Sequence, residues 1–131
     1  MQASEATPYE RLGGETAVRA LVDRFYQVMD QDPVAAGVRA VHDASLASAS
    51  EKLFLFLSGW LGGPSLYVEK YGHPMLRARH LPFPINERMR DEWLYCMYQA
   101  LEQVCAHDVA LKEELEQAFL RTADFMRNRE G

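Results

Sequence analysis

The sequence is poor in cysteine and lacks the common zinc-binding motifs. Its 131 residues include two cysteines, Cys96 and Cys105, and neither a Cys-x-x-Cys nor a His-Glu-x-x-His pattern occurs. The two cysteines stand nine positions apart in one expected helix, which places them on opposite faces and roughly 13 Å apart along its axis. Cα atoms joined by a disulfide lie within about 7 Å, so this bridge is excluded while the helix is intact. Two lone thiols are typical of a reducing cytosol.

Basic clusters and long apolar runs are also missing. The net charge is −5 at pH 7 and the lysines and arginines are scattered, so we expect no nucleic acid and no anionic membrane as a partner. Residues 1–10 lack the basic start and the apolar run of a signal peptide, and no segment approaches the ~20 apolar residues of a membrane span. We therefore expect the protein in the cytoplasm.

Apolar and aromatic residues, by contrast, are abundant. Hydrophobic residues make up 48% of the chain and aromatic residues 11%, which argues against disorder. A chain of this length can bury a core without disulfides or metals. We therefore expect a single domain over residues 1–131.

The spacing of apolar residues predicts helices. Between residues 15 and 29 they recur at steps of three and four, the pattern of a helix buried along one stripe. No run alternates with period two between hairpin turns, so the predicted fold class is all-α. After a loose lead-in we expect a helical turn from Thr7 and Pro8 to Gly13 and Gly14, helices over 15–29, 34–41, 46–61, 86–107 and 108–127, and a mostly irregular connection over 65–72 that lays Leu66, Tyr67 and Tyr71 on the core.

Polar residues predict where the later helices begin. Ser45 or Ser48 can cap the helix over 46–61, because a serine oxygen can accept a bond from a free backbone N–H of the first turn. Asn86 and Asp108 can do the same for the last two helices. Two glycines and a proline at 62–64 supply a left-handed residue and then a stop.

The segment from Tyr71 to Ile85, YGHPMLRARHLPFPI, organises the prediction of function. Proline at position 74 suits the first turn of a helix, whereas the prolines at 82 and 84 cannot continue one. His80 should therefore lie near the end of a helix of about two turns. So short a helix does not hold itself together in water, and we hypothesise that an iron bound to His80 helps to fix it. A surface histidine favoured by the helix dipole is the alternative.

Five stretches of the chain together resemble the truncated haemoglobins, and group II of that family in particular. The resemblance covers nearly the whole chain in the right order, and its GHPxLRxRH combination followed by a tryptophan is specific. It implies a globin-like, truncated two-on-two sandwich of helices around haem b (iron protoporphyrin IX), whereas periodicity alone indicates only a helical domain. The stretches are PYERLGG at 8–14, RFYQVM at 24–29, WLGGP at 60–64, YGHPMLRARHLPF at 71–83 and DEWLYCM at 91–97.

The resemblance assigns His80 as the proximal iron ligand, with the other ring N–H donated to a backbone carbonyl. It places Tyr26 and Trp93 on the distal side, where the hydroxyl and the indole N–H face a bound ligand; packing in the core is the alternative for both. His42 matches a distal position that carries tyrosine, phenylalanine or histidine in relatives, and its tautomer decides whether it donates or accepts. An exposed loop histidine is the alternative there.

The remaining pocket residues also come from the resemblance. Ala49 matches the position of a classical distal histidine, and its methyl group cannot form a hydrogen bond. Haem propionates call for cations or hydroxyls, and Arg79 next to the ligand can supply a bidentate fork. The apolar wall of the pocket would consist of Phe25, Leu53, Phe56 and Met97, and the further propionate candidates are Lys52, Tyr67, His73 and Arg77. The alternative is core packing for the apolar residues and a solvated surface position for the propionate candidates. His107 is expected on the surface, and Cys96 is expected to be inert.

These assignments predict a globin that binds O2, CO, NO or other small ligands at one iron. Two distal donors should slow ligand release, which suits sensing, scavenging or redox chemistry with NO or peroxide rather than bulk oxygen transport. The sequence shows no positioned acid–base pair, so NO dioxygenation or weak peroxidase activity stays open. Such an activity would need a reductase, which is unidentified. A homodimer also stays open. The first alternative is a haem-free helical sensor or interaction module. The second is a non-haem metal protein, but this sequence lacks the Glu-x-x-His pairs of metal-binding helix bundles.

Overall fold

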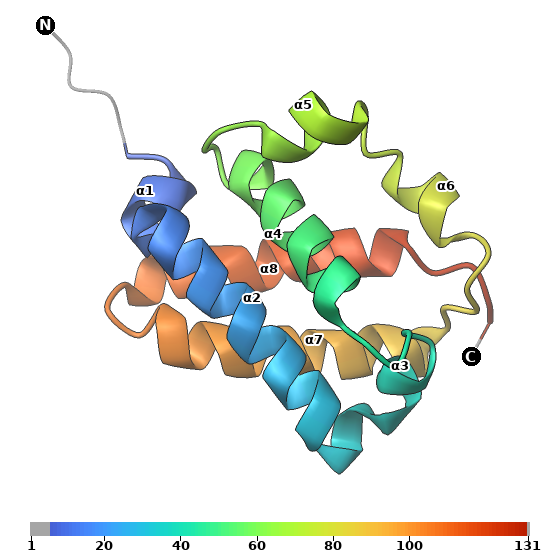
Figure 1. Ribbon diagram of the computed structural model, residues 1–131. Helices are drawn as coiled ribbons and strands as arrows, with labels where there is room; N and C mark the ends of the chain where they lie inside the picture. Colours follow the sequence, from blue (N-terminus) through green and yellow to red (C-terminus); the bar gives the residue numbers. More distant parts are fainter. Residues whose placement is uncertain (1–5, 131) are drawn as a thin grey trace, which may run out of the picture.

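A computed structural model of the protein describes residues 6–130; residues 1–5 and 131, which include most of the expected lead-in, lie outside it. The described part of the chain is helical and contains no strand, which confirms the all-α prediction. In Figure 1 the elements follow one another as α1 (Pro8–Leu12), α2 (Gly14–Gln31), the 3₁₀ turn η1 (Pro33–Ala35), α3 (Ala36–Ala40), α4 (Ala47–Trp60), α5 (Leu66–Tyr71), α6 (Leu76–His80), α7 (Glu87–Val104) and α8 (Val109–Phe125).

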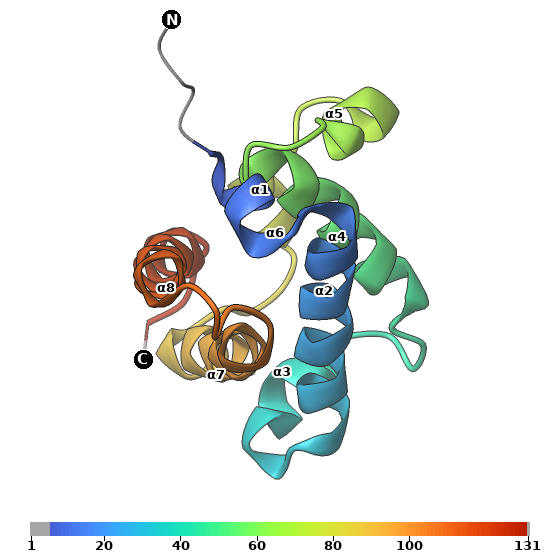
Figure 2. The same cartoon turned by 90° about the vertical axis from the view of Figure 1, so that its left-hand side faces the viewer.

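Four long helices form two pairs that pack on each other. Helix α2 packs against α4, α7 packs against α8, and α2 also lies along α7, so the two pairs share one core. Figure 2 shows α7 and α8 side by side, with α2 and α4 as the other pair. Fully buried side chains fill the space between them, among them Leu21, Phe25, Met29, Met97 and Leu101. This is the two-on-two arrangement that the sequence predicts.

Three helices begin at the caps expected from the sequence. The hydroxyl of Thr7 accepts a bond from the Glu10 amide at 3.1 Å while the Glu10 carboxylate accepts one from the Thr7 amide at 3.0 Å, a reciprocal capping box. Asn86 caps α7 and Asp108 caps α8 in the same way, each through a side-chain oxygen 3.0 Å from an amide nitrogen three residues on. These caps pair free backbone donors and so define where the helices start.

The start of α4 differs from the prediction. Leu46 is the N-cap of this helix, and neither Ser45 nor Ser48 occupies that position. Ser45, one residue before the N-cap, still accepts a hydrogen bond from the amide of Ala47 at 3.3 Å. The end of the helix agrees with the prediction, because Gly62 has a positive φ of 94° and lies against Thr7, where a side chain would be both strained and crowded.

The connection over residues 65–72 is a helix, α5, and the prediction of a mostly irregular segment is wrong. Six residues are too few to show a helical period, and so short a helix depends on tertiary packing. Tyr67 supplies it, because this side chain is buried and its ring centre lies 6.3 Å from that of Phe56 on α4. Tyr71 is 39% exposed and so does not lie on the core as expected.

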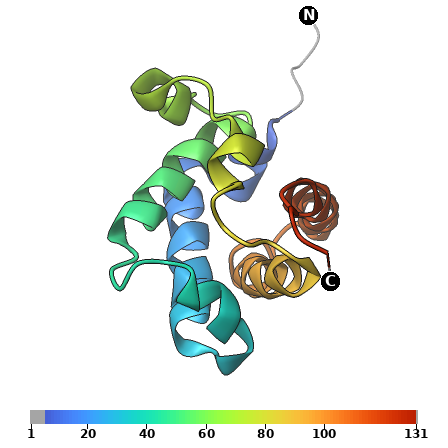
Figure 3. The ribbon, with the colours of Figure 1, turned by 90° about the vertical axis from the view of Figure 1, so that its right-hand side faces the viewer.

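Helix α6 is shorter than predicted and begins later. It spans five residues instead of about two turns, and Pro74 lies outside it. Met75 has a left-handed backbone with φ 49° and ψ 50°, which a right-handed helix cannot include, so the helix starts after it. His80 is its last residue, in agreement with the expected position near the helix end. Figure 3 shows α6 in front of α4, with the loop after it leading down to α7.

The two cysteines are free and completely buried. Cys96 lies in α7, whereas Cys105 is the residue directly after it, because the helix ends at Val104, three residues before the expected end at residue 107. Burial raises the pKa of the Cys96 thiol to about 12, with the Asp32 and Glu92 carboxylates adding to the effect. Among residues 6–130, no helix is both long enough and apolar enough to cross a membrane.

Candidate functional site

The imidazole of His80 is held by its own helix. Nδ1 lies 2.6 Å from the carbonyl oxygen of Leu76, one turn earlier in α6, and the ring is half-buried. A carbonyl oxygen can only accept, so Nδ1 carries the proton of this bond. In the neutral ring Nε2 then keeps an unprotonated lone pair. This is the tautomer in which an imidazole binds a metal through Nε2 while Nδ1 orients the ring.

Two polar aromatic side chains pack on Phe25, and a third lies beside one of them. The ring of Phe25 is fully buried, and its centre lies 4.8 Å from that of Tyr26 and 5.0 Å from that of Trp93, both edge to face. The ring of His42 lies 6.0 Å from that of Tyr26. The structure therefore brings together the three side chains that the sequence assigned to the distal side.

The hydroxyl of Tyr26 is a donor without an acceptor within the described residues. Burial alone raises its pKa well above the ordinary value for tyrosine, and no hydrogen bond contributes to that shift. The group is therefore protonated at neutral pH. A hydroxyl without a protein partner can donate a hydrogen bond to a ligand that reaches it.

The ring of His42 is oriented by a backbone carbonyl, as the ring of His80 is. Nδ1 of His42 lies 2.9 Å from the carbonyl oxygen of Val38, so Nδ1 donates. In the neutral ring Nε2 is then an acceptor. His42 follows α3 at the turn where the sequence placed it, and it is half-buried.

A buried carboxylate that the sequence analysis missed holds this turn in place. Glu92 accepts a bond from the Val38 amide at 2.8 Å and a second from Arg88 at 2.9 Å. A Cβ atom at position 37 would lie 2.9 Å from both carboxylate oxygens, so Gly37 leaves room for them. One sequence signal indicates that Glu92 is buried. It precedes Cys96 and Ala100 by four and eight positions and so lies in the same buried row of α7.

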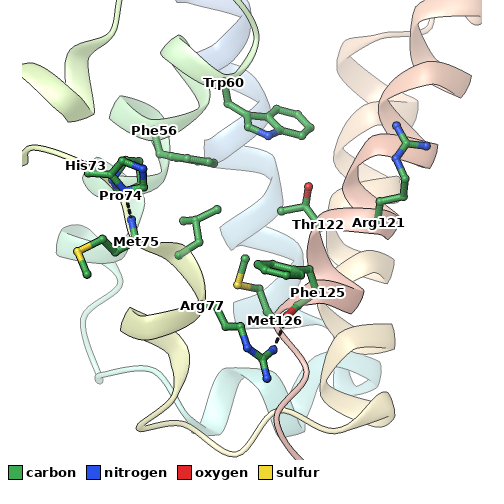
Figure 4. Close-up of a pocket in the computed structure, with 11 residues that line it drawn as sticks. Phe56, Trp60, His73, Pro74, Met75, Arg77, Arg121, Thr122, Phe125 and Met126 are labelled. Atoms are coloured by element: carbon green, nitrogen blue, oxygen red, sulfur yellow. Dashed lines mark hydrogen bonds between the residues drawn. The ribbon is translucent and has the colours of Figure 1, made fainter.

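A pocket of about 590 Å³ opens between α4, α6 and the C-terminal end of α8 (Figure 4). Its volume falls in the range of about 300–1,000 Å³ typical of small-molecule and cofactor sites. Figure 4 shows Phe56 and Trp60 of α4 facing Thr122, Phe125 and Met126 at the end of α8. The remaining lining residues come from α6 and the residues before it and from the outer side of α8: His73, Pro74, Met75, Leu76, Arg77 and Arg121.

A row of aromatic rings connects this pocket with the side chains around Phe25. His80, Tyr26 and Trp93 do not line the pocket themselves. The ring of Trp93 lies 5.8 Å from that of Phe119, which stacks at 4.6 Å on Trp60 in the pocket wall. Leu76, whose carbonyl orients His80, also lines the pocket. The pocket, the His80 helix and the aromatic residues around Phe25 are therefore parts of one region.

The expected apolar wall divides into two groups. Phe25 and Met97 are fully buried and belong to the core between the helix pairs. Ala49, Leu53 and Phe56 are half-buried along one side of α4, three or four positions apart. Of these three only Phe56 lines the pocket, and Ala49 and Leu53 lie on the same side of the helix. Packing in the core accounts for Phe25 and Met97.

The charged propionate candidates and His73 lie at the surface, whereas Tyr67 is buried. Arg79 donates to the Pro74 carbonyl at 2.7 Å and lies 5.9 Å from the ring centre of Tyr67. Lys52 is exposed beside Tyr71, and Nδ1 of His73 accepts a bond from the Met75 amide at 3.1 Å. Arg77 differs, because its Nη1 donates to the carbonyls of Phe125 and Arg127 at 2.7 and 2.9 Å.

His107 is exposed, and its Nε2 lies 2.9 Å from the Arg11 carbonyl, far along the chain from the other histidines. It lines neither the pocket nor the group around Phe25. This agrees with the expectation of a surface histidine, and it makes His107 a suitable control position.

Comparison with known proteins gives one family. The family model described as bacterial-like globin matches residues 7–128. A group 2 truncated haemoglobin of Bacillus subtilis is 43% identical over 104 residues, which cover 79% of this chain and 76% of that protein.

Solved structures agree in fold and in sequence. The group II 2-on-2 haemoglobin of Agrobacterium tumefaciens superposes with a TM-score of 0.93 at 44% identity and covers 100% of both chains. The cold-adapted truncated haemoglobin of Pseudoalteromonas haloplanktis superposes with a TM-score of 0.91 at 45% identity, over 95% of this chain and 99% of that one. The chain therefore belongs to the bacterial-like globin family and is a truncated haemoglobin of group II.

Proposed function

We propose that this globin binds haem b through His80 and takes up O2, CO, NO or another small ligand at the haem iron. Membership of the globin family implies haem and ligand binding, and the assignment of the residues is ours. The observation that carries the assignment is the 2.6 Å contact between Nδ1 of His80 and the Leu76 carbonyl. It orients the ring and leaves the Nε2 lone pair for a metal.

The residues around α4 and α6 fit a large flat apolar group with two carboxylates. The pocket is lined mainly by apolar side chains such as Phe56 and Leu76, and Ala49 and Leu53 continue this wall along α4. Arg79, Lys52, Tyr67 and His73 lie where propionates would meet cations, hydroxyls or ring nitrogens. Arg77 is the weakest of these candidates because two carbonyls already use its Nη1. Haem, when bound, supplies an iron that can take a diatomic ligand.

The distal side offers donors to that ligand. The Tyr26 hydroxyl has no partner in the described structure, and we assign it and the Trp93 indole N–H as the two donors. Bound O2 carries partial negative charge, so each donor stabilises it by roughly 1–3 kcal/mol, which is about a tenfold to hundredfold gain in affinity. His42, whose Nδ1 is bound to the Val38 carbonyl, presents an acceptor at Nε2.

Two donors favour slow ligand release. A protein that holds its ligand in this way suits sensing, scavenging or redox chemistry with NO or peroxide better than bulk oxygen transport. Repeated redox turnover needs an electron source, and we propose an unidentified reductase for that role. We also propose that residues 1–131 form a single domain that works in the cytoplasm.

Visible spectra of the purified, reduced protein with and without carbon monoxide test this function. We expect a Soret band that shifts when carbon monoxide is added, since the iron has an open position. A protein that takes up no added haem and shows no Soret band would instead support the haem-free helical sensor or interaction module. Binding to His80 itself is tested separately at the end of the Discussion.

A further inference from the structure

The residues that follow α8 are bound to the loop that follows the His80 helix. Asn128 makes the central contacts. Its Nδ2 donates to the carbonyls of His80 at 3.2 Å and Phe83 at 2.9 Å. Its Oδ1 accepts from the amide of Ile85 at 3.0 Å, and its own amide donates to the Ile85 carbonyl at 2.9 Å. One asparagine therefore binds the loop at three successive points.

A second contact ties the start of α6 to the same C-terminal residues. Arg77 donates to the carbonyls of Phe125 and Arg127, so residues 125–128 contact α6 near both of its ends. Figure 4 shows the Arg77 guanidinium directed at the end of α8. The C-terminal end of the chain is therefore part of the structure that holds this helix.

Helix α6 needs such support because it has little of its own. It has five residues and none of them is buried. A helix of this length does not recover its nucleation cost, and no hydrophobic side chain of α6 is buried to offset it. The hydrogen bonds between α6 and residues 125–128 therefore support this helix near both of its ends.

We propose that Asn128 is a positioning residue for His80, and that it sets the direction in which the imidazole presents Nε2. The inference rests on the proposed role of His80 and deepens it. His80 is held at two points: its ring by the Leu76 carbonyl through Nδ1, and its own carbonyl by Asn128. With Asn128 in place, rotation of the last peptide unit of α6 is restricted, and the ring keeps one orientation.

Two substitutions separate the contacts of Asn128. Asn128→Ala removes both donors and the acceptor. Asn128→Asp keeps an oxygen for the Ile85 amide, removes the two donors and places a negative charge against the carbonyls of His80 and Phe83. Both should loosen the end of α6, and the aspartate variant should do so without loss of the contact to Ile85.

The second asparagine of the chain supplies the matched control. Asn86 also accepts a backbone bond through Oδ1, but that bond comes from the Met89 amide and caps α7. Asn86→Ala should lower global stability through the lost cap, whereas Asn86→Asp should be nearly neutral because the two residues cap equally well. A signal that follows global stability alone would therefore appear in Asn86→Ala too.

The test uses the haem-loaded, reduced protein without added ligand. The iron–histidine stretching band in resonance Raman spectra and the rate of haem transfer to an excess of an apoglobin acceptor are measured for all variants. For Asn128→Ala and Asn128→Asp we expect a shifted or broadened band and haem loss about three- to tenfold faster, the effect of one net hydrogen bond. The band of Asn86→Ala should match that of the wild type.

Two results would overturn the inference: Asn128 variants with a wild-type band and wild-type haem loss, or an equal band shift in Asn86→Ala. If Asn128→Ala does not fold, Asn128→Asp decides by the same criteria. Failure of the proposed function looks different, because a wild type that binds no haem, or shows no iron–histidine band, fails before any Asn128 variant is compared.

Discussion

The carboxylate of Glu92 lies 2.8 Å from the amide nitrogen of Val38, 54 positions earlier in the chain. Only 6% of Glu92 is exposed, and it is next to Trp93 in α7. The carbonyl of the same Val38 accepts the bond from His42. A buried carboxylate next to Trp93 thus fixes the turn that carries His42.

This contact makes the glycine at position 37 a necessary residue. Gly37→Ala would place a methyl group 2.9 Å from both carboxylate oxygens, and Glu92 can move away only by giving up its bond to Val38. We expect a loss of about 1–3 kcal/mol in the free energy of unfolding. Helix propensity alone predicts the opposite sign, because alanine is favoured over glycine by up to about 1 kcal/mol in a helix.

A double-mutant cycle in chemical denaturation checks the cause. Glu92→Ala should itself cost about 1–3 kcal/mol because the Val38 amide loses its partner. In that background Gly37→Ala should cost nothing or stabilise, since the carboxylate is gone. Equal costs of Gly37→Ala in both backgrounds would contradict this account of the glycine.

The distal donors predict the rate of oxygen release. Tyr26→Phe and Trp93→Phe should each speed release by about tenfold to a hundredfold, because each removes one donor and keeps the ring. Flash photolysis or stopped-flow mixing with a scavenger measures the rate. Tyr98→Phe is the control, since its hydroxyl donates to the Glu116 carbonyl at 3.3 Å on the other side of α7. If neither distal substitution changes the rate, the assignment of the distal side fails.

The pair of Asp108 and Arg11 predicts a pH dependence of stability. The bonds from Arg11, followed by the bond from the Leu111 amide, hold the pKa of Asp108 below its ordinary value. A folded pKa below the unfolded value of about 3.9 means that the contribution is complete above that pH and is lost as the pH falls through the folded pKa.

Asp108→Asn isolates the charge, because asparagine caps a helix as well as aspartate does. The wild type should therefore melt at a higher temperature than the variant at neutral pH, and the difference should vanish in acid. Glu113→Gln, an exposed change on the same helix, should show no such trend. A difference that stays constant down to acid pH would mean that Asp108 stabilises the protein only as a cap.

The thiols should be unreactive in the folded protein. Cys96 and Cys105 are completely buried, and burial raises the pKa of both, that of Cys96 to about 12. Only the thiolate attacks a disulfide reagent, so a thiol assay should detect no reactive group in the native state and two after denaturation. Rapid labelling of the native protein would show that the α7 region opens.

Local sequence signals predicted much of the fold. Thr7, Asn86 and Asp108 cap their helices as expected, because a cap depends on residues only a few positions apart. Helix α5 was missed because it depends on the packing of Tyr67 against Phe56, which no short pattern contains. The later start of α6 follows from the left-handed backbone of Met75, for which its side chain gives no signal.

The candidate site was less accessible to sequence reasoning alone. Periodicity places Tyr26 and Trp93 on helices, but their approach to one Phe25 ring is a tertiary relationship, and only the resemblance to a family linked them to His80. Asn128 and Glu92 were missed for the same reason, because their partners lie about 45 and 54 positions away. Such contacts depend on how helices pack, and a single sequence does not show this directly.

The most direct test of the central claim replaces the imidazole of His80. His80→Gly is loaded with haem in the presence of free imidazole, dialysed, reduced and compared with His107→Gly. We expect the His80 variant to bind haem only while imidazole is present and to lose its Soret band on dialysis, while the His107 variant keeps a wild-type spectrum. A His80 variant that retains haem and the five-coordinate ferrous spectrum without imidazole would contradict the claim.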